Sequence, residues 1–342
     1  MLDSLSNILI PPNISAYQYV STVRSYPTHI IAKVRDIDGN GFLCYLFNRD
    51  RLFEYGLLDD TIAKMDAVSK LKHLNIAATI EFSNNELLYL ITEDSTALNL
   101  KEYVATNGRL SDTEVLRISK SIADALTIMH MQHVAHGGLD SRAICFDFSM
   151  IPKLSYFDFA CDINIRKIEK VEVNIMNYFP PEFLQFNSNN QFTKDAWCLG
   201  IITYFMTCAQ YPFISANQIK LVNIIIKCQY MLPPTTHPTI HALIAKTLVQ
   251  DPSQRANARY ISMMLRSVEA APQRQKILRK FAQSQTLGRP RPPTQICIEE
   301  VARCGQISFR RVSVDSAAQA PSLPRTRLQP CSYTNAVRSS IL

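Results

Sequence analysis

The first part of the chain alternates hydrophobic and polar residues in short runs, which is the pattern of half-buried β-strands. Residues 36–40, Asp-Ile-Asp-Gly-Asn, are turn formers and separate the first two of these runs as a hairpin connection would. Residues 57–74 interrupt the series with apolar residues at helical spacing. The strand-like runs are 20–34, 41–47, 76–82 and 86–92. Together they predict a small, mostly β lobe that ends near residue 93.

Beyond residue 93 the apolar residues recur every three or four positions, which predicts helices. Ser111 and Glu114 have the spacing of a capping box, in which each side chain accepts a hydrogen bond from the other residue's backbone amide. Further helical runs are 197–207, 218–228, 240–249 and 259–268. The pattern predicts the α+β class, with a larger, mostly helical lobe after the first one.

The composition is that of a globular chain with a sizeable core, because 47% of the 342 residues are hydrophobic. No apolar run reaches the roughly 18 residues that a membrane span needs, so we expect no transmembrane segment. The N-terminus has no basic start and does not resemble a signal peptide. The nine cysteines form no CxxC pair, which argues against a zinc site or a disulfide scaffold and favours the cytoplasm or the nucleus.

Positive charge is concentrated at the C-terminal end of the chain. Residues 272–342 contain 12 Lys and Arg against 3 Asp and Glu, a net charge of +9, which leaves −2 of the total of +7 for the rest. Because this segment is also rich in Ser and Pro, we expect a disordered tail. A basic tail can bind membranes or nucleic acids without specificity, but it lacks interleaved aromatic residues, so no specific nucleic acid is expected. Ser313 follows Arg310-Arg311-Val312 and is a candidate phosphosite.

Residues 136–143 read His-Gly-Gly-Leu-Asp-Ser-Arg-Ala, and Asp-Phe-Ala follows at 158–160. These segments resemble the H-R-D-L-x-x-x-N catalytic loop and the D-F-G motif of protein kinases. Five more segments resemble kinase motifs in the family's order, and these are 72–76, 88–93, 180–182, 195–200 and 251–255. The resemblance implies a bilobal protein-kinase fold, nearest to Ser/Thr kinases. Its parts would be an extension 1–16, an N-lobe 17–93, a C-lobe 94–271 and the tail 272–342.

The residues that match the family are those that hold the fold together. The resemblance implies a buried ion pair between Glu182 and Arg255, and it implies that Asp195 ties its helix to the catalytic loop. Loss of one member of a buried pair costs several kcal/mol, so we expect these residues to be structural. His136 and Phe159 are expected to act as packing residues of the same centre.

The residues that depart from the family are those that carry the reaction. The resemblance places Gly138 where the catalytic Asp stands and Ala143 where an Asn binds the second magnesium. Tyr45 stands in place of the phosphate-binding Lys, and Lys64 in place of the C-helix Glu that pairs with it. Asp140 replaces the Lys that steadies the transferred phosphate and is a weak substitute for the base.

The nucleotide pocket departs from the family pattern as well. The glycine-rich loop aligns with residues 23–30, which contain no Gly. Side chains stand at its three glycine positions, which are Val23, Ser25 and Thr28. The resemblance places Thr92 at the gatekeeper position and Leu43 against adenine, where its side chain would fill part of the pocket. Asp158 is retained as a magnesium ligand of the family.

The sequence therefore predicts a pseudokinase, a catalytically inactive kinase-like domain that acts as a protein-interaction, scaffold or allosteric module. Its partner would be another protein, such as an active kinase or the substrate of one, and no cofactor is expected. Two alternatives remain open. The first is an atypical active Ser/Thr protein kinase that uses magnesium–ATP with Asp158 and Asp140. The second is a membrane or nucleic-acid binder that acts through the basic tail.

Overall fold

The computed structural model describes residues 11–94, 98–159, 173–187 and 190–267. The chain divides into two units, Met1–Gln283 and Ser284–Leu342. The second unit lies wholly outside the described residues, as do the predicted tail and the candidate phosphosite Ser313. No helix within the described ranges has the length and apolar character that crossing a membrane requires.

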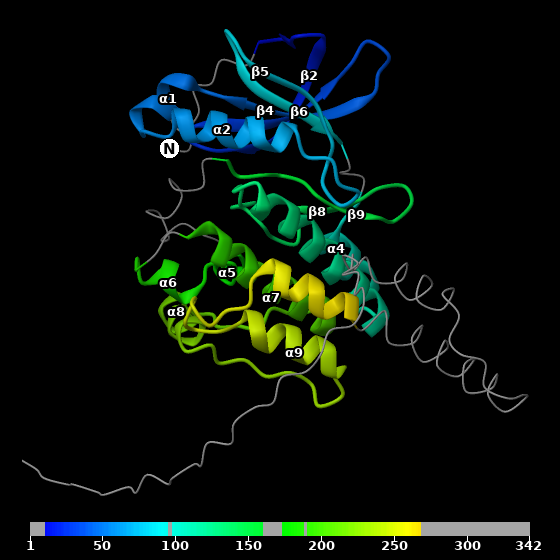
Figure 1. The fold of residues 1–342 in the computed structure, drawn as a ribbon, viewed down its shortest axis with the longest axis vertical. Coiled ribbons are helices and arrows are strands. Elements are labelled where there is room, and N and C mark those ends of the chain that lie inside the picture. Colours follow the sequence, from blue (N-terminus) through cyan, green and yellow to red (C-terminus); the bar gives the residue numbers. More distant parts are fainter. Residues whose placement is uncertain (1–10, 95–97, 160–172, 188–189, 268–342) are drawn as a thin grey trace, which may run out of the picture. The chain divides into compact units, whose positions relative to one another are not determined.

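The N-terminal lobe is a six-stranded antiparallel sheet in the order β1-β2-β3-β4-β6-β5, with two helices against it (Figure 1). The strands are β1 (Asn13–Ile14), β2 (Tyr17–Ser25), β3 (His29–Arg35), β4 (Gly41–Phe47), β5 (Thr79–Asn84) and β6 (Leu88–Glu93). The helices are α1 (Arg49–Glu54) and α2 (Leu58–Ser69). β1 belongs to the predicted N-terminal extension, yet it pairs with β2 and buries Ile14 completely.

The two faces of this sheet pack into different clusters because side chains alternate along each strand. On β4, Cys44 and Leu46 belong to a cluster on one face, together with Ile14 and Ile91. Tyr45 and its neighbours Leu43 and Phe47 belong to the main core that continues into the second lobe. The register of β3 and β4 places Ile31 directly opposite Tyr45.

The C-terminal lobe is mostly helical and lies below the sheet in Figure 1. Its helices are α3 (Leu100–Asn107), α4 (Asp112–Met131), α5 (Val173–Met176), α6 (Pro181–Leu184), α7 (Gln191–Cys208), α8 (Gln218–Ile226) and α9 (Pro238–Thr247). A last helix spans 258–267. A small antiparallel sheet contains β7 (Leu98–Asn99), β8 (Ile144–Phe146) and β9 (Pro152–Leu154).

Helix α7 is the centre of this lobe and is buried on every side, as its continuous apolar sequence requires. Gly200 lets α9 approach it, because a Cβ there would lie 2.8 Å from Leu248 Cδ2. The lobes join where the amide of Ala77 donates to the Leu154 carbonyl at 2.9 Å. The fold is therefore the bilobal α+β kinase fold that the motifs predicted.

The helical pattern also predicted several boundaries correctly. Ser111 and Glu114 form the capping box at the start of α4. The strand expected at 20–34 is instead the hairpin β2–β3, because Pro27 and its neighbours turn the chain at 26–28. Helices α1 and α3 were missed, since each is too short to show an amphipathic period.

Candidate functional site

The catalytic-loop segment begins at His136, whose side chain is fully buried. Its Nε2 lies 2.9 Å from the Ser155 carbonyl, and its ring packs against Phe157 at 5.2 Å between centroids. Burial lowers the pKa of His136, although the nearby carboxylate of Asp195 opposes that shift. Gly137 follows with a φ of +75°, a conformation in which only glycine is unstrained. These contacts make His136 a packing residue of the loop.

Asp195 fixes this loop to the start of helix α7. Its carboxylate accepts hydrogen bonds from the amides of His136 at 2.8 Å and Gly137 at 3.1 Å. His130 Nε2 lies 2.9 Å from the same carboxylate, a contact between residues 65 apart that no local pattern predicts. Burial alone would raise the pKa of Asp195, but the hydrogen bonds from His130 and His136 outweigh it and lower the pKa.

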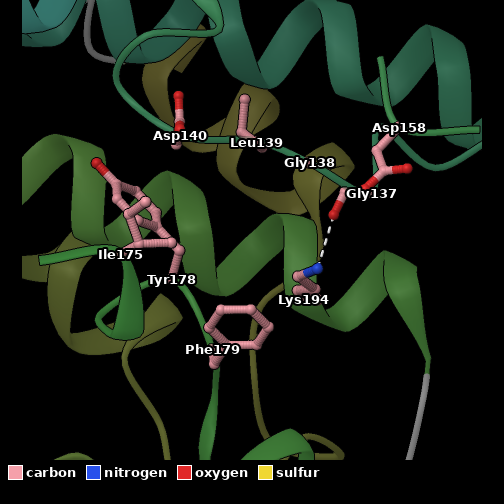
Figure 2. A pocket seen from close by; sticks show the side chains of 9 residues that line it. All are labelled: Gly137, Gly138, Leu139, Asp140, Asp158, Ile175, Tyr178, Phe179 and Lys194. Atoms are coloured by element: carbon pink, nitrogen blue, oxygen red, sulfur yellow. Dashed lines mark hydrogen bonds between the residues drawn. The ribbon is translucent and has the colours of Figure 1, made fainter. Parts of the chain in front are cut away.

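Gly138, at the position of the catalytic base, lies unusually close to Asp158. A Cβ at residue 138 would lie 2.9 Å from Asp158 Cβ, a separation that real side chains do not tolerate. The Asp158 amide also donates to the His136 carbonyl at 3.1 Å, which holds the two segments together. Figure 2 shows both residues at the wall of one pocket. Gly138 therefore carries no carboxylate, and the space that a side chain would take there is occupied by Asp158.

Asp140, the candidate substitute base, is a buried structural residue. Its carboxylate accepts hydrogen bonds from the amides of Arg142 at 2.7 Å and Ala143 at 3.0 Å. The Arg142 guanidinium donates to it at 2.9 and 2.6 Å, and Arg24 lies 3.9 Å away. Both oxygens are thus engaged in holding the turn. Ala143 is fully buried and offers no ligand atom from its side chain.

Tyr45, which the resemblance aligns with the family's lysine, lies in the core between the sheet and the segment before Asp158. The side chain is fully buried, and its hydroxyl accepts a hydrogen bond from the Tyr156 amide at 2.8 Å. The ring lies edge-on to Phe159 at 5.8 Å and tilted to Phe157 at 6.2 Å. Burial strongly raises the pKa of Tyr45, so the phenol stays neutral. The side chain thus links the sheet to the segment that contains Asp158.

The other predicted residues of the pocket lie around Tyr45. Leu43 and Thr92 are directly opposite each other on β4 and β6, and both are fully buried. Lys64, on α2, pairs with Asp60 of the same helix at 2.5 Å. Lys64, which the resemblance aligns with the family's glutamate, is thus engaged within its own helix.

The β2–β3 hairpin carries Arg24, which reaches the second lobe, and Tyr26 and His29, which stack on each other. The Arg24 guanidinium lies 4.2 Å above the Tyr156 ring as well as near Asp140. Tyr26 stacks on His29 at 4.3 Å, and burial lowers the pKa of His29 to about 3. These positions are each one residue beyond the assigned glycine positions, of which Val23 and Ser25 are exposed.

An aromatic series continues from this hairpin to the Asp158 segment. His29 stacks on Phe47 at 4.6 Å, and Phe47 lies edge-on to Phe159 at 6.1 Å. Phe159 is itself 2% exposed. A continuous series of aromatic contacts therefore connects the hairpin to Phe159, the neighbour of the predicted magnesium ligand Asp158.

The structural residues of the family lie where the resemblance placed them. Arg255 donates to both oxygens of Glu182, at 2.6 and 2.9 Å, and its guanidinium is fully buried. It also donates to the carbonyls of Thr193 and Val249 at 3.0 Å each and lies 5.1 Å from the Trp197 ring. The charges are thus paired and the remaining donors are used, which is the condition for a buried ion pair to be stable.

No three metal-ligating side chains of the described ranges lie close enough together to hold a metal ion. Sequence reasoning missed Arg24, Tyr26, His29 and Phe47, whose contacts lead to Tyr156 and Phe159. The two-residue period of strands could have found His29 and Phe47, which share a face with Ile31 and Tyr45, but a register shift before Arg24 breaks that period on β2.

Comparisons with known proteins agree with the geometry. The family model described as protein kinase domain matches residues 53–265. The SNF-related serine/threonine-protein kinase of Rattus norvegicus is 27% identical over 206 residues, 59% of this chain and 28% of the relative. The Aurora kinase of Candida glabrata is 25% identical over 219 residues, 63% and 61% of the two chains. Serine/threonine-protein kinase SIK1 of Mus musculus is 24% identical over 199 residues, 58% and 26%. The chain thus spans about a quarter of the length of two of these relatives and less than two thirds of the third.

Proposed function

Because the chain belongs to the protein kinase superfamily, we propose that it is a pseudokinase, a kinase fold that binds other proteins without transferring phosphate. The observation that carries the proposal is the set of side-chain contacts between the lobes around Tyr45, at the positions where the family binds nucleotide. The Tyr45 hydroxyl accepts a hydrogen bond from the Tyr156 amide at 2.8 Å, and Arg24 lies over the Tyr156 ring.

Phosphoryl transfer requires a cation on the phosphates, metal ligands and a base that orients the acceptor hydroxyl. Here the cation is replaced by the neutral phenol of Tyr45, and Gly138 has no side chain that could serve as the base. Ala143 supplies no second metal ligand, so Asp158 would have to hold magnesium without the family's Asn. The residues present therefore do not fit magnesium–ATP, and we assign no cofactor.

The alternative of an atypical active kinase needs Asp140 as its base. That carboxylate accepts hydrogen bonds from two backbone amides and from the Arg142 guanidinium. If Asp140 acted as the base, these bonds, which hold the turn at residues 140–143, would be lost. The alternative of a membrane or nucleic-acid binder rests on the basic tail, and no observation on the described residues favours it. A specific nucleic-acid partner is not proposed.

We propose that the partner is another protein, such as an active kinase or its substrate, and that binding takes place in the cytoplasm or the nucleus. The buried Glu182–Arg255 pair and the Asp195 contacts support this function, because they join elements of the second lobe through side chains of the chain itself. An ordered surface binds with a smaller loss of conformational entropy than one that must fold on binding.

The test is thermal unfolding of the full chain with and without millimolar ATP, each with and without magnesium. We expect the same midpoint in all four conditions. A ligand at a hundred times its Kd would stabilise the protein by about 2.7 kcal/mol, a readily measured shift. A magnesium-dependent shift that disappears in Asp158→Asn would contradict the proposal, and turnover of Asp140→Asn would then decide whether the chain is an atypical kinase.

A further inference from the structure

A second feature of the site is a cavity of about 100 Å³ between the catalytic-loop segment and the residues before α6. Gly138 and Leu139 form one wall, and Ile175, Tyr178 and Phe179 form another. A single water needs roughly 10–15 Å³ by the same measure, so the cavity has room for a group of several heavy atoms. Figure 2 shows that the side chain of Lys194 projects into it from α7.

Lys194 is an unusual residue for such a position, because it is a cation that is 8% exposed. Its Nζ donates to the Gly137 carbonyl at 2.7 Å. It also lies 5.2 Å from the Phe179 ring and 5.4 Å from the Phe183 ring, which are weak cation–π distances. These contacts orient the ammonium group but bring no negative charge to it.

The carboxylates nearest in the chain and in the cavity do not pair with this lysine. Within the described ranges, no carboxylate oxygen lies within 4.0 Å of Lys194 Nζ. Asp195 turns to His130 and the amides of the catalytic loop, and Asp140 is held by Arg142. Asp158 also borders the cavity and lies beside Gly137 in Figure 2. An anion in the cavity would therefore be attracted by Lys194 and repelled by Asp158.

A buried cation without a counter-ion is costly, and proteins normally pair such charges. Lys194 is also the fourth residue of α7, near the positive end of the helix dipole, which disfavours a cation and favours an anion. Both effects would be relieved by a negatively charged group in the cavity. Gly138 adds no carboxylate of its own, so the lining carboxylates that would repel the anion are Asp140, which is paired with Arg142, and Asp158.

We propose that this cavity binds an anionic group, a carboxylate or a phosphate carried on a side chain of a partner protein, with Lys194 as its counter-ion. The inference rests on the proposed protein-binding function and names the chemistry that the partner presents. The anionic oxygens pair with Lys194 Nζ, and the apolar rings of Tyr178 and Phe179 surround the carbon stem.

The experiment measures the thermal midpoint of the full chain in sodium phosphate, sodium acetate and sodium chloride at equal ionic strength and pH, without nucleotide or magnesium. We expect phosphate or acetate to raise the midpoint above that in chloride. Lys194→Met should abolish this difference, and Lys220→Met, an exposed lysine on α8, should keep it. Both variants retain the basic tail, so ion binding by the tail is the same in each.

Short peptides with a central Asp, phosphoserine or Ser then separate the two anions. We expect the Asp or the phosphoserine peptide to bind at least about tenfold more tightly than the Ser peptide, and Lys194→Met to remove that difference. Equal midpoints in the three salts, or an anion effect that persists in Lys194→Met, would overturn the proposal.

The anion-free stability of Lys194→Met is an independent measurement. Because the substitution removes an unpaired buried charge, we expect a midpoint equal to or above that of the wild type. A variant that is clearly less stable or fails to fold would show that Lys194 is already satisfied within the chain, which also overturns the proposal. Magnesium–ATP binding would refute the pseudokinase function but would leave these nucleotide-free results unchanged.

Discussion

The hydroxyl of Tyr45 offers a direct test of how the chain fills its own cleft. Tyr45→Phe removes one oxygen and keeps the ring contacts with Phe157 and Phe159, at 6.2 and 5.8 Å. The Tyr156 amide, which donates to that oxygen at 2.8 Å, would lose its partner. Tyr156 is 7% exposed, so water does not readily replace the lost bond.

The expected cost follows from this burial. An unsatisfied buried donor costs about 1–3 kcal/mol, so Tyr45→Phe should lower the free energy of unfolding by that amount. Tyr45→Ala removes the ring as well, and replacing a buried aromatic residue by alanine costs about 3–5 kcal/mol. The difference between the two variants therefore separates the hydrogen bond from the packing of the ring.

Urea unfolding of the full chain, followed by far-UV circular dichroism, measures both values. Tyr260→Phe is the matched control, because Tyr260 is 49% exposed and its loss of a hydroxyl should be nearly neutral. If Tyr45→Phe were as stable as the wild type, the hydroxyl would not link the sheet to the Asp158 segment. A variant as unstable as Tyr45→Ala would instead indicate that the phenylalanine ring no longer fits the cleft.

Two further predictions concern other residues of the same cleft. His29 has a pKa of about 3 in the fold against 6.5 as the ordinary value, so unfolding takes up a proton between these pH values and stability falls as the pH drops through them. Between pH 6 and pH 4, His29 should lower the free energy of unfolding by about 2 kcal/mol. Urea titrations at the two pH values should find that this fall is about 2 kcal/mol smaller in His29→Phe. Gly138→Ala should lose about 1–3 kcal/mol, since its Cβ would lie 2.9 Å from Asp158 Cβ. Gly41→Ala, whose Cβ meets nothing closer than 3.7 Å, is the control, and equal midpoints for the two glycine variants would refute the steric argument.

The order of motifs along the chain was enough to predict the two-lobed fold, and it supplied the prediction of which residues depart from the family. This works because those motifs are local, and their spacing is fixed by the loops and helices that carry them. The substitutions Gly138 and Ala143 lie between the matched residues His136 and Asp158, so no shift of the alignment could move them. The Ser111–Glu114 capping box was predictable for the same reason, since both residues belong to one helical turn.

The tertiary structure alone decided which side chains lie between the lobes and, beyond the Glu182–Arg255 pair, which charges are paired. A shift of one residue in a strand turns every side chain to the other face, and the resemblance assigned the glycine positions to Val23, Ser25 and Thr28. In the structure it is Arg24 that lies over Tyr156, while Tyr26 stacks on His29. The burial of Lys194 without a nearby carboxylate likewise depends on residues far apart in the sequence, because a cavity forms only where separate elements meet.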